Sequence, residues 1–214
     1  MADTRALRDR TTPSSSLRVL GVDPALAGAT GYGVVECQGS RAMLLKFGAL
    51  KLPAKASFGT RLHEIHDLIA RLLEEFAPDV VAVESVFTAL NMGTALRLAE
   101  VRGVVLLAAA QARIPAQSYS PREVKATVAG YGAASKQQMQ QMVSSLLGLT
   151  RCPEPADAAD ALAVALCHAQ MSQARDRMAA ATGLRSSAAT RSGAGKAAVG
   201  QGNRARPARI QSFQ

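Results

Sequence analysis

The chain has 214 residues, of which 48% are hydrophobic, and its three cysteines lack CxxC spacing. This length and hydrophobic content fit one globular domain with a substantial core and room for flexible ends. The longest apolar stretch is far shorter than the roughly 20 residues of a membrane span, and the N-terminal residues lack the apolar segment of a secretory signal. We therefore expect neither a membrane-spanning nor a secreted protein, but a chain of the reducing cytoplasm.

The formal net charge is +9, and most of it lies in the C-terminal part. Residues 171–214 contain eight Lys or Arg and one acidic residue, whereas residues 17–170 contain 14 and 13. Segments 1–16 and 172–214 lack regularly spaced large apolar residues, which predicts a disordered N-terminal arm and a disordered basic tail. The tail is expected to add weak, salt-sensitive affinity for phosphates, and the domain at 17–171 must attract an anionic partner locally.

Hydrophobic periodicity predicts five strands and four helices in the domain. In chain order they are strands at 18–23, 30–37 and 42–50, a helix ending before Pro78, a strand at 80–84, a helix at 92–112, a strand at 114–119, a helix behind a Ser135 cap, and a last helix at 155–170. Three early strands followed by strand–helix alternation indicate an α/β fold with a five-stranded mixed sheet and helices on both faces.

Four acidic residues stand at the ends of predicted buried elements. Asp23 ends the first strand, Glu84 ends the fourth, and Asp157 and Asp160 lie three residues apart near the start of the last helix. If the two strands are parallel neighbours, their carboxyl ends meet at one edge of the sheet, and the helical pair projects from nearly one face. Buried carboxylates are costly without a cation. The pattern predicts two Mg²⁺ or Mn²⁺ ions and hence a metal-dependent phosphodiester hydrolase.

Each acidic residue alone also has a structural explanation. Asp157 complements the dipole at a helix start, and Asp23 before Pro24 is a common turn residue. Glu84 is harder to explain in this way, because no Lys or Arg lies within several residues of it along the chain. Because three separate coincidences would be needed, we favour a shared cation.

Five stretches of the chain resemble the Holliday-junction resolvase family called RuvC, which is built on the RNase H-like fold. They are 21–24 (Gly-Val-Asp-Pro), 30–34 (Thr-Gly-Tyr-Gly-Val), 83–87 (Val-Glu-Ser-Val-Phe), 129–136 (Ala-Gly-Tyr-Gly-Ala-Ala-Ser-Lys) and 157–163 (Asp-Ala-Ala-Asp-Ala-Leu-Ala). The resemblance implies that Asp23, Glu84, Asp157 and Asp160 are both the catalytic acids and the metal ligands. It also implies a homodimer that makes paired, symmetric nicks in four-way DNA junctions during recombination and repair, together with a branch-migration motor.

By the same resemblance, DNA contacts are expected from Phe87, Lys125 and Lys136. Phe87 follows Glu84 by three residues, and an aromatic side chain beside a nucleic-acid site stacks on bases; a core position is the alternative. Lys136 follows the Ser135 cap, where a bound phosphate would offset the unfavourable cation at a helix start. For both lysines the alternative is a solvated surface position.

The chain departs from the family pattern in its first turn. Ala25 stands where the family usually has Gly, and the loop up to Thr30 is one residue longer than in many members. No role is therefore assigned to 25–29.

Two other functions fit part of the pattern. A nucleotide-binding protein of the actin and sugar-kinase type has a similar Asp-turn-Thr-Gly opening, but it needs a second, similar domain, for which about 155 ordered residues are too few. A catalytically inactive junction-binding module is disfavoured because all four acids are present. The helix at 92–112, which contains Gly103, is compatible both with a dimer interface and with ordinary core packing.

Overall fold

The structure is a computed structural model that describes residues 16–24, 29–85 and 92–182. The strands in this part are β1 (Ser16–Asp23), β2 (Thr30–Gln38), β3 (Arg41–Leu50), β4 (Val80–Glu84) and β5 (Ala116–Tyr119). The helices are α1 (Phe58–Phe76), α2 (Met92–Gln111), α3 (Pro121–Ala129), α4 (Lys136–Leu146) and α5 (Ala156–Ala181). None of these helices is long and apolar enough to cross a membrane.

The five strands form one mixed sheet in the order β3-β2-β1-β4-β5. Strand β1 lies at the centre, antiparallel to β2 and parallel to β4, while β5 continues the parallel half beyond β4. Strands β2 and β3 form a hairpin whose turn begins at Gly39, with a φ of 55° that favours glycine. The predicted mixed sheet of five strands is therefore confirmed.

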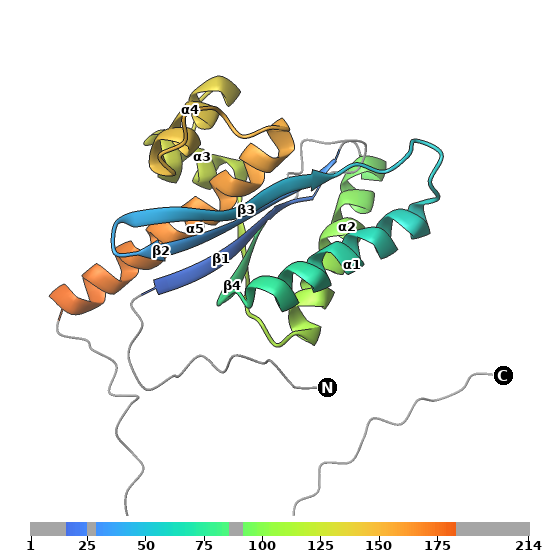
Figure 1. Cartoon of the computed structure of the whole chain (residues 1–214), viewed down its shortest axis with the longest axis horizontal. Coiled ribbons are helices and arrows are strands. Elements are labelled where there is room, and N and C mark those ends of the chain that lie inside the picture. The colour runs from blue at the N-terminus through green and yellow to red at the C-terminus, as the bar shows by residue number, and fades with distance from the viewer. Residues whose placement is uncertain (1–15, 25–28, 86–91, 183–214) are drawn as a thin grey trace, which may run out of the picture.

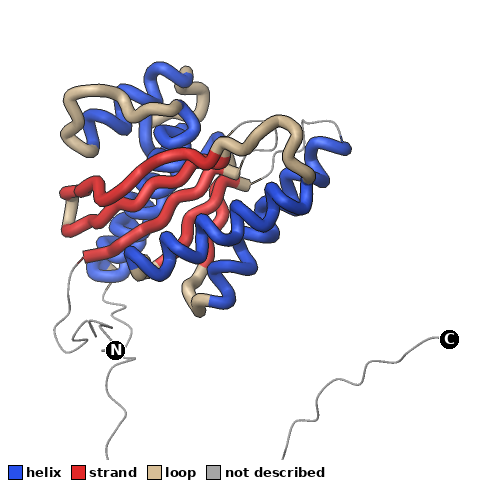
Figure 2. Tube along the Cα trace, turned by 45° about the vertical axis from the view of Figure 1, so that its right-hand side comes forward, coloured by secondary structure: helices blue, strands red, loops and turns tan. Residues whose placement is uncertain are grey.

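Helices cover both faces of the sheet (Figures 1 and 2). Helices α1 and α2 pack on one face, where Leu20 and Val22 of β1 enter the core, and α3, α4 and α5 pack on the other, where Val19 does. Successive side chains of a strand point to opposite faces. This alternation places Gly21 and Asp23 on the α5 side of the central strand.

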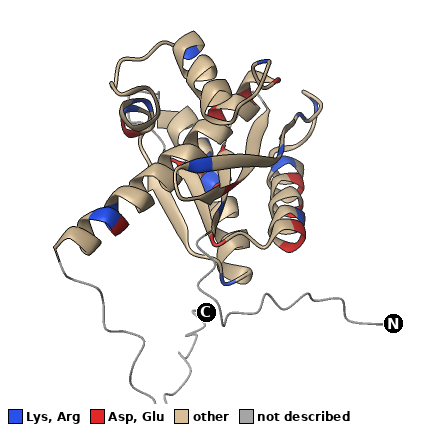
Figure 3. Cartoon of the chain, turned by 60° about the vertical axis from the view of Figure 1, so that its left-hand side comes forward, with Lys and Arg blue, Asp and Glu red and all other residues tan. Residues whose placement is uncertain are grey.

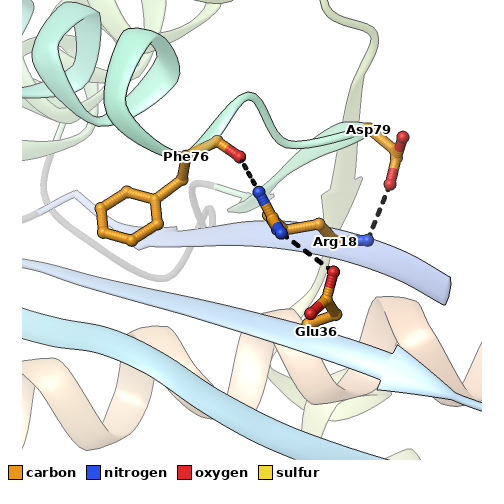
Figure 4. A network of polar contacts seen from close by, with 4 residues as sticks. All are labelled: Arg18, Glu36, Phe76 and Asp79. Atoms are coloured by element: carbon orange, nitrogen blue, oxygen red, sulfur yellow. Dashed lines mark hydrogen bonds and ion pairs between the residues drawn. The ribbon is translucent and has the colours of Figure 1, made fainter. Parts of the chain in front are cut away.

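An arginine at the start of β1 fixes the first strand against β4 (Figure 4). The Arg18 guanidinium donates to the Phe76 carbonyl oxygen at the end of α1, at 2.5 Å, and pairs with Glu36 at 2.9 Å. The backbone N–H of Arg18 donates to Asp79 Oδ2, and the N–H of Asp79 donates back to the Arg18 carbonyl oxygen. These bonds hold the starts of β1 and β4 together, and so set the register at their far ends.

Glycines on β1 and β2 allow α5 to lie directly against the sheet. A Cβ at Gly21 would lie 2.1 Å from the Ala161 carbonyl oxygen, and a Cβ at Gly31 would lie 1.9 Å from the Asp157 carbonyl oxygen. Gly33 likewise faces α5 at a distance that leaves no room for a side chain. The many Ala residues of α5 also allow this close packing, because their side chains are small, as predicted.

One helix was missed by the sequence prediction. Helix α3 begins with Ser120 as its N-cap, Pro121 as its first residue and Glu123 completing a capping box. This is a recognised signature of a helix start, so the signal was present in the sequence. The correct order of elements has three helices after β5 rather than two.

The predicted end of the last helix was also wrong. Helix α5 continues from the expected Gln170 to Ala181, so the expectation of a disordered tail from residue 172 is corrected for these residues. An Ala-rich sequence favours helix, and the Gln173 side chain donates to the Gly39 carbonyl oxygen of the β2–β3 turn. The end of α5 projects beyond the sheet and carries both basic and acidic residues (Figures 1 and 3). The predicted arm up to residue 15 and the tail from 183 lie outside the described residues.

The close packing of α5 against β1 predicts the effect of adding a side chain at Gly21. Gly21→Ala is expected to lower the free energy of unfolding by about 1–3 kcal/mol or more, because the backbone of α5 must move to admit the methyl group. Urea denaturation of this variant and of Gly59→Ala provides the measurement. Gly59 lies in the first turn of α1 with nothing within 4 Å of the position that a methyl group would occupy, so its replacement should change stability by less than about 1 kcal/mol. Equal stability of the two variants would contradict the packing argument.

Candidate active site

The parallel pairing of β1 and β4 brings two acidic residues together at the carboxyl edge of the sheet. Val22 pairs with Val83, so the next residues on these strands, Asp23 and Glu84, stand side by side. By strand alternation both point toward α5, and their carboxyl groups are close enough to share a hydrogen bond when one is protonated. The predicted meeting of these two strand ends is thus confirmed.

The start of α5 brings the other two acidic residues to the same place. Gly31 pairs with Asp23 across β1 and β2, and the backbone of Asp157 lies against Gly31. The first turn of α5 is therefore placed beside the end of β1. Asp160 lies one turn further along the helix, on the face that Asp157 also occupies.

The four carboxyl groups repel one another electrostatically. Burial, followed by the negative charges of Glu84, Asp160 and Asp157, raises the pKa of Asp23 to about 8. The pKa of Glu84 is also raised, chiefly by burial, although the hydrogen bond from Asp23 and the charge of Lys125 act in the opposite direction. The site thus carries more negative charge than its own cations balance.

Lys136 contacts this acidic group directly. Its Nζ lies 3.0 Å from Asp160 Oδ2, and this hydrogen bond, with the charges of the acidic residues, raises the lysine pKa. Lys136 is the first residue of α4, whose start is fixed by a capping box of Ser135 and Gln138, as predicted. The predicted lysine is therefore at the acidic site.

A cavity of about 240 Å³ opens beside the acidic residues between β4, α3, α4 and α5. Its lining residues are Glu84, Pro121, Val124, Lys125, Lys136, Met139, Asp160 and Ala163. Both predicted lysines thus line the same cavity as two of the predicted acids. The cavity has an acidic edge, a cationic edge and an apolar wall.

Some sequence predictions have no counterpart in the described structure. Phe87 lies outside the described residues, as does most of the 25–29 loop. As the side chains stand in the described ranges, no three His, Cys, Asp or Glu residues surround a common point closely enough to hold a metal ion. Asp160 contacts Lys136, and Asp23 lies within hydrogen-bonding reach of Glu84.

Two supporting features of the site were missed from the sequence. The backbone N–H and the hydroxyl of Ser85 both donate to the Tyr119 carbonyl oxygen, which ties the end of β4 to β5 immediately after Glu84. Gly31 and Gly33 alternate on one face of β2, and such a pattern within a strand is a signal for close approach of another backbone.

Comparison with known proteins identifies the family. A family model described as crossover junction endodeoxyribonuclease RuvC matches residues 19–168. The chain belongs to the RuvC family. Membership of this nuclease family implies dependence on a divalent metal, and it confirms the resemblance drawn from the five sequence stretches.

Individual relatives are covered over nearly their whole length. A RuvC from Thermomicrobium roseum is 50% identical over 158 residues, which are 74% of this chain and 96% of the relative. One from Syntrophomonas wolfei is 46% identical over 152 residues, 71% of this chain and 88% of the relative. Among solved structures, the RuvC of Thermus thermophilus in complex with a Holliday junction substrate is 36% identical in sequence and has a TM-score of 0.70. The match covers 74% of this chain and 96% of the Thermus thermophilus chain. The yeast mitochondrial Holliday junction resolvase Ydc2 is 15% identical and has a TM-score of 0.55. The match covers 78% of this chain and 84% of Ydc2, and at this identity it supports the fold alone.

The raised pKa of Asp23 predicts how the metal-free protein responds to pH. Folded Asp23 keeps its proton up to about pH 8, whereas in the unfolded chain it loses the proton near its ordinary value of 3.8. The folded state therefore binds more protons between these values, and stability falls as pH rises through this window. Asp23→Asn removes this titratable group. At pH 8 the free energy of unfolding of this variant is expected to be about 1–3 kcal/mol higher than that of the wild type, with little difference at pH 4.

Urea denaturation at several pH values in the presence of EDTA measures this difference. A gap between wild type and variant that does not widen from pH 4 to pH 8 would contradict the repulsion among the carboxyl groups.

Proposed function

We propose that this chain is a structure-selective endonuclease that resolves four-way (Holliday) DNA junctions in recombination and repair by paired, symmetric nicks. One observation carries the proposal: Asp23 and Glu84 stand side by side at the ends of parallel strands, with the start of α5 held against them. In a chain of the RuvC family, these residues and Asp157 and Asp160 are best understood as the catalytic acids and metal ligands.

The proposed cofactor is a pair of Mg²⁺ or Mn²⁺ ions. Hard divalent cations prefer carboxylate oxygens, and the raised pKa of Asp23 reflects an excess of negative charge that such cations would balance. When bound, these ions supply a more acidic attacking water and stabilise the leaving 3′-oxygen. For the protein, loading would require Asp23 to release its proton, because the raised pKa keeps this carboxyl group protonated near neutral pH.

The proposed DNA contacts lie on the cationic side of the cavity. Lys136 stands at the N-terminus of α4, where a phosphate would be favoured by the helix dipole as well as by the lysine. Lys125 lines the same cavity from α3. A phosphate of the cleaved strand placed there would lie next to Glu84 and Asp160. Phe87 is retained as a proposed DNA contact.

We further propose a homodimer formed through α2. Met92, Leu96 and Leu107 are 74%, 58% and 53% exposed and recur on one side of the helix with Gly103. Nothing lies within 4 Å of a methyl group built on Gly103, which leaves space for a second helix to approach closely. A twofold dimer would present two identical sites to the two strands that must be nicked symmetrically.

The compartment proposed for this chain is the cytoplasm. The cysteines Cys37, Cys152 and Cys167 are all free, which fits a reducing cytoplasm. By family resemblance, a branch-migration motor is the expected protein partner. The basic sequence beyond residue 182 is proposed to add salt-sensitive affinity for DNA.

The role of Glu84 is tested by neutralising it. Glu84→Gln keeps the size of the side chain but removes its charge, so nicking of a synthetic four-way junction with Mg²⁺ should fall at least about 100-fold while junction binding is retained. Glu75 is an exposed residue of α1 that pairs with Lys46. Glu75→Gln is the matched control and should nick normally. Normal nicking by Glu84→Gln would remove Glu84 from the catalytic set, and binding by the wild type without any nicking would favour an inactive binding module.

The dimer is tested by placing a charge on the exposed face of α2. Leu96→Glu is expected to yield monomers in analytical ultracentrifugation at concentrations where the wild type is dimeric, because a carboxylate cannot be buried unpaired in an apolar interface. Met178→Glu, at a 69% exposed position near the end of α5, should leave the association unchanged. A wild type that is monomeric, or a Leu96→Glu dimer of unchanged affinity, would overturn the proposed interface.

A further inference from the structure

An exposed tyrosine lies in the connection between α3 and α4. The side chain of Tyr131 is 47% exposed, which makes it the most exposed aromatic side chain in the described part of the chain. Single exposed aromatic side chains are common on protein surfaces, but this one stands in the connection between the two helices that supply both lysines of the cavity.

The flanking glycines hold this tyrosine at the surface. Gly130 ends α3 with a φ of 85°, a conformation that favours glycine. A Cβ at Gly132 would lie 2.8 Å from the Cγ atom of Arg122, so the backbone after Tyr131 packs closely on the stem of that arginine. Ser135 then caps α4. The connection is thus fixed on both sides of Tyr131 by elements with defined geometry.

The stretch of sequence that contains Tyr131 is rich in basic residues. Residues 121–153 contain four Lys or Arg and a single acidic residue, Glu123. The Glu123 carboxylate accepts hydrogen bonds from the backbone and hydroxyl of Ser120, so it serves the start of α3. Lys125 and Lys136, which belong to the two helices that Tyr131 joins, line the cavity next to the acidic residues. An anionic ligand with flat, apolar groups matches this surface.

We propose that Tyr131 is a substrate-positioning residue that stacks on an unpaired or partly unstacked base near the branch point of the bound DNA. The proposal rests on the function proposed above. Aromatic side chains beside cationic grooves bind nucleic acids by stacking on bases, while the cations contact the phosphates. Tyr131 fixes the base, Lys125 and Lys136 fix the neighbouring phosphates, and together they determine which phosphodiester enters the acidic site.

The experiment compares the full-length wild type with Tyr131→Ala and Tyr131→Phe. Junction affinity is measured by fluorescence anisotropy in EDTA, and single-turnover nicking is measured with Mg²⁺ at saturating enzyme. Tyr131→Ala is expected to weaken binding roughly 5- to 100-fold, in line with the loss of one stacked base, and to spread the nicks at saturating enzyme over neighbouring phosphodiesters. Tyr131→Phe keeps the ring and should bind like the wild type. Met43→Ala, at a 53% exposed position on β3, is the control for loss of an exposed apolar side chain.

A set of junctions with single abasic sites around the branch point identifies the base. One abasic position should weaken binding by the wild type but not weaken Tyr131→Ala any further, because the ring and the base form one contact. Wild-type affinity in Tyr131→Ala, or equal additional loss at every abasic position, would overturn the stacking role and leave the surface to a protein partner. A wild type that does not bind four-way junctions would overturn the proposed function itself, which keeps the two failures distinct.

Discussion

The close approach of α5 to the centre of the sheet is the constraint on which the rest of the structure depends. Gly21 and Gly31 leave no space for a Cβ because the backbone of α5 occupies it, and Gly31 is also the cross-strand partner of Asp23. Any side chain at either position would push the backbone of α5 away from the sheet. The same contact therefore closes the core on this face and brings Asp157 beside Asp23, so packing and site geometry cannot vary independently.

The acidic site opposes the stability that this packing provides. Burial and mutual repulsion raise the pKa of Asp23 and Glu84, which means that the folded chain holds their charges at a cost. Two sets of hydrogen bonds keep the strand ends in register: those of Ser85 to β5 and those of Arg18 at the other end of β1. Neither set neutralises the charge of the acids. The acids on β1 and β4 are thus attached to paired strands, whose hydrogen bonds fix their backbone positions without offsetting their charge.

The sequence was sufficient to predict the parts of the fold that follow from local patterns. The apolar runs ending at Asp23 and Glu84 predicted buried strands, and strand ends in a parallel pair must meet at one edge. The Ser120–Glu123 capping box was overlooked because it directly follows a short strand, and α5 was ended too early because its last turns bury little apolar surface. The pairing of Lys136 with Asp160 was beyond reach from the sequence, since it depends on how α4 is oriented against α5.

The cavity beside the site places opposite demands on its lining. A nuclease of this kind must hold several carboxylates together and also admit a phosphodiester, which the carboxylates alone would repel. Here the acids come from strand ends and the start of α5, whereas the cations come from α3 and α4, across the same cavity. The ion pair of Lys136 with Asp160, at 3.0 Å, shows how closely the two sets approach each other. The Lys136 ammonium has three N–H donors, so it can contact an anion in the cavity while it remains paired with Asp160. One lysine thus offsets the charge of the acids and attracts an anion at the same point of the cavity, which is how a lining of opposite charges meets both demands.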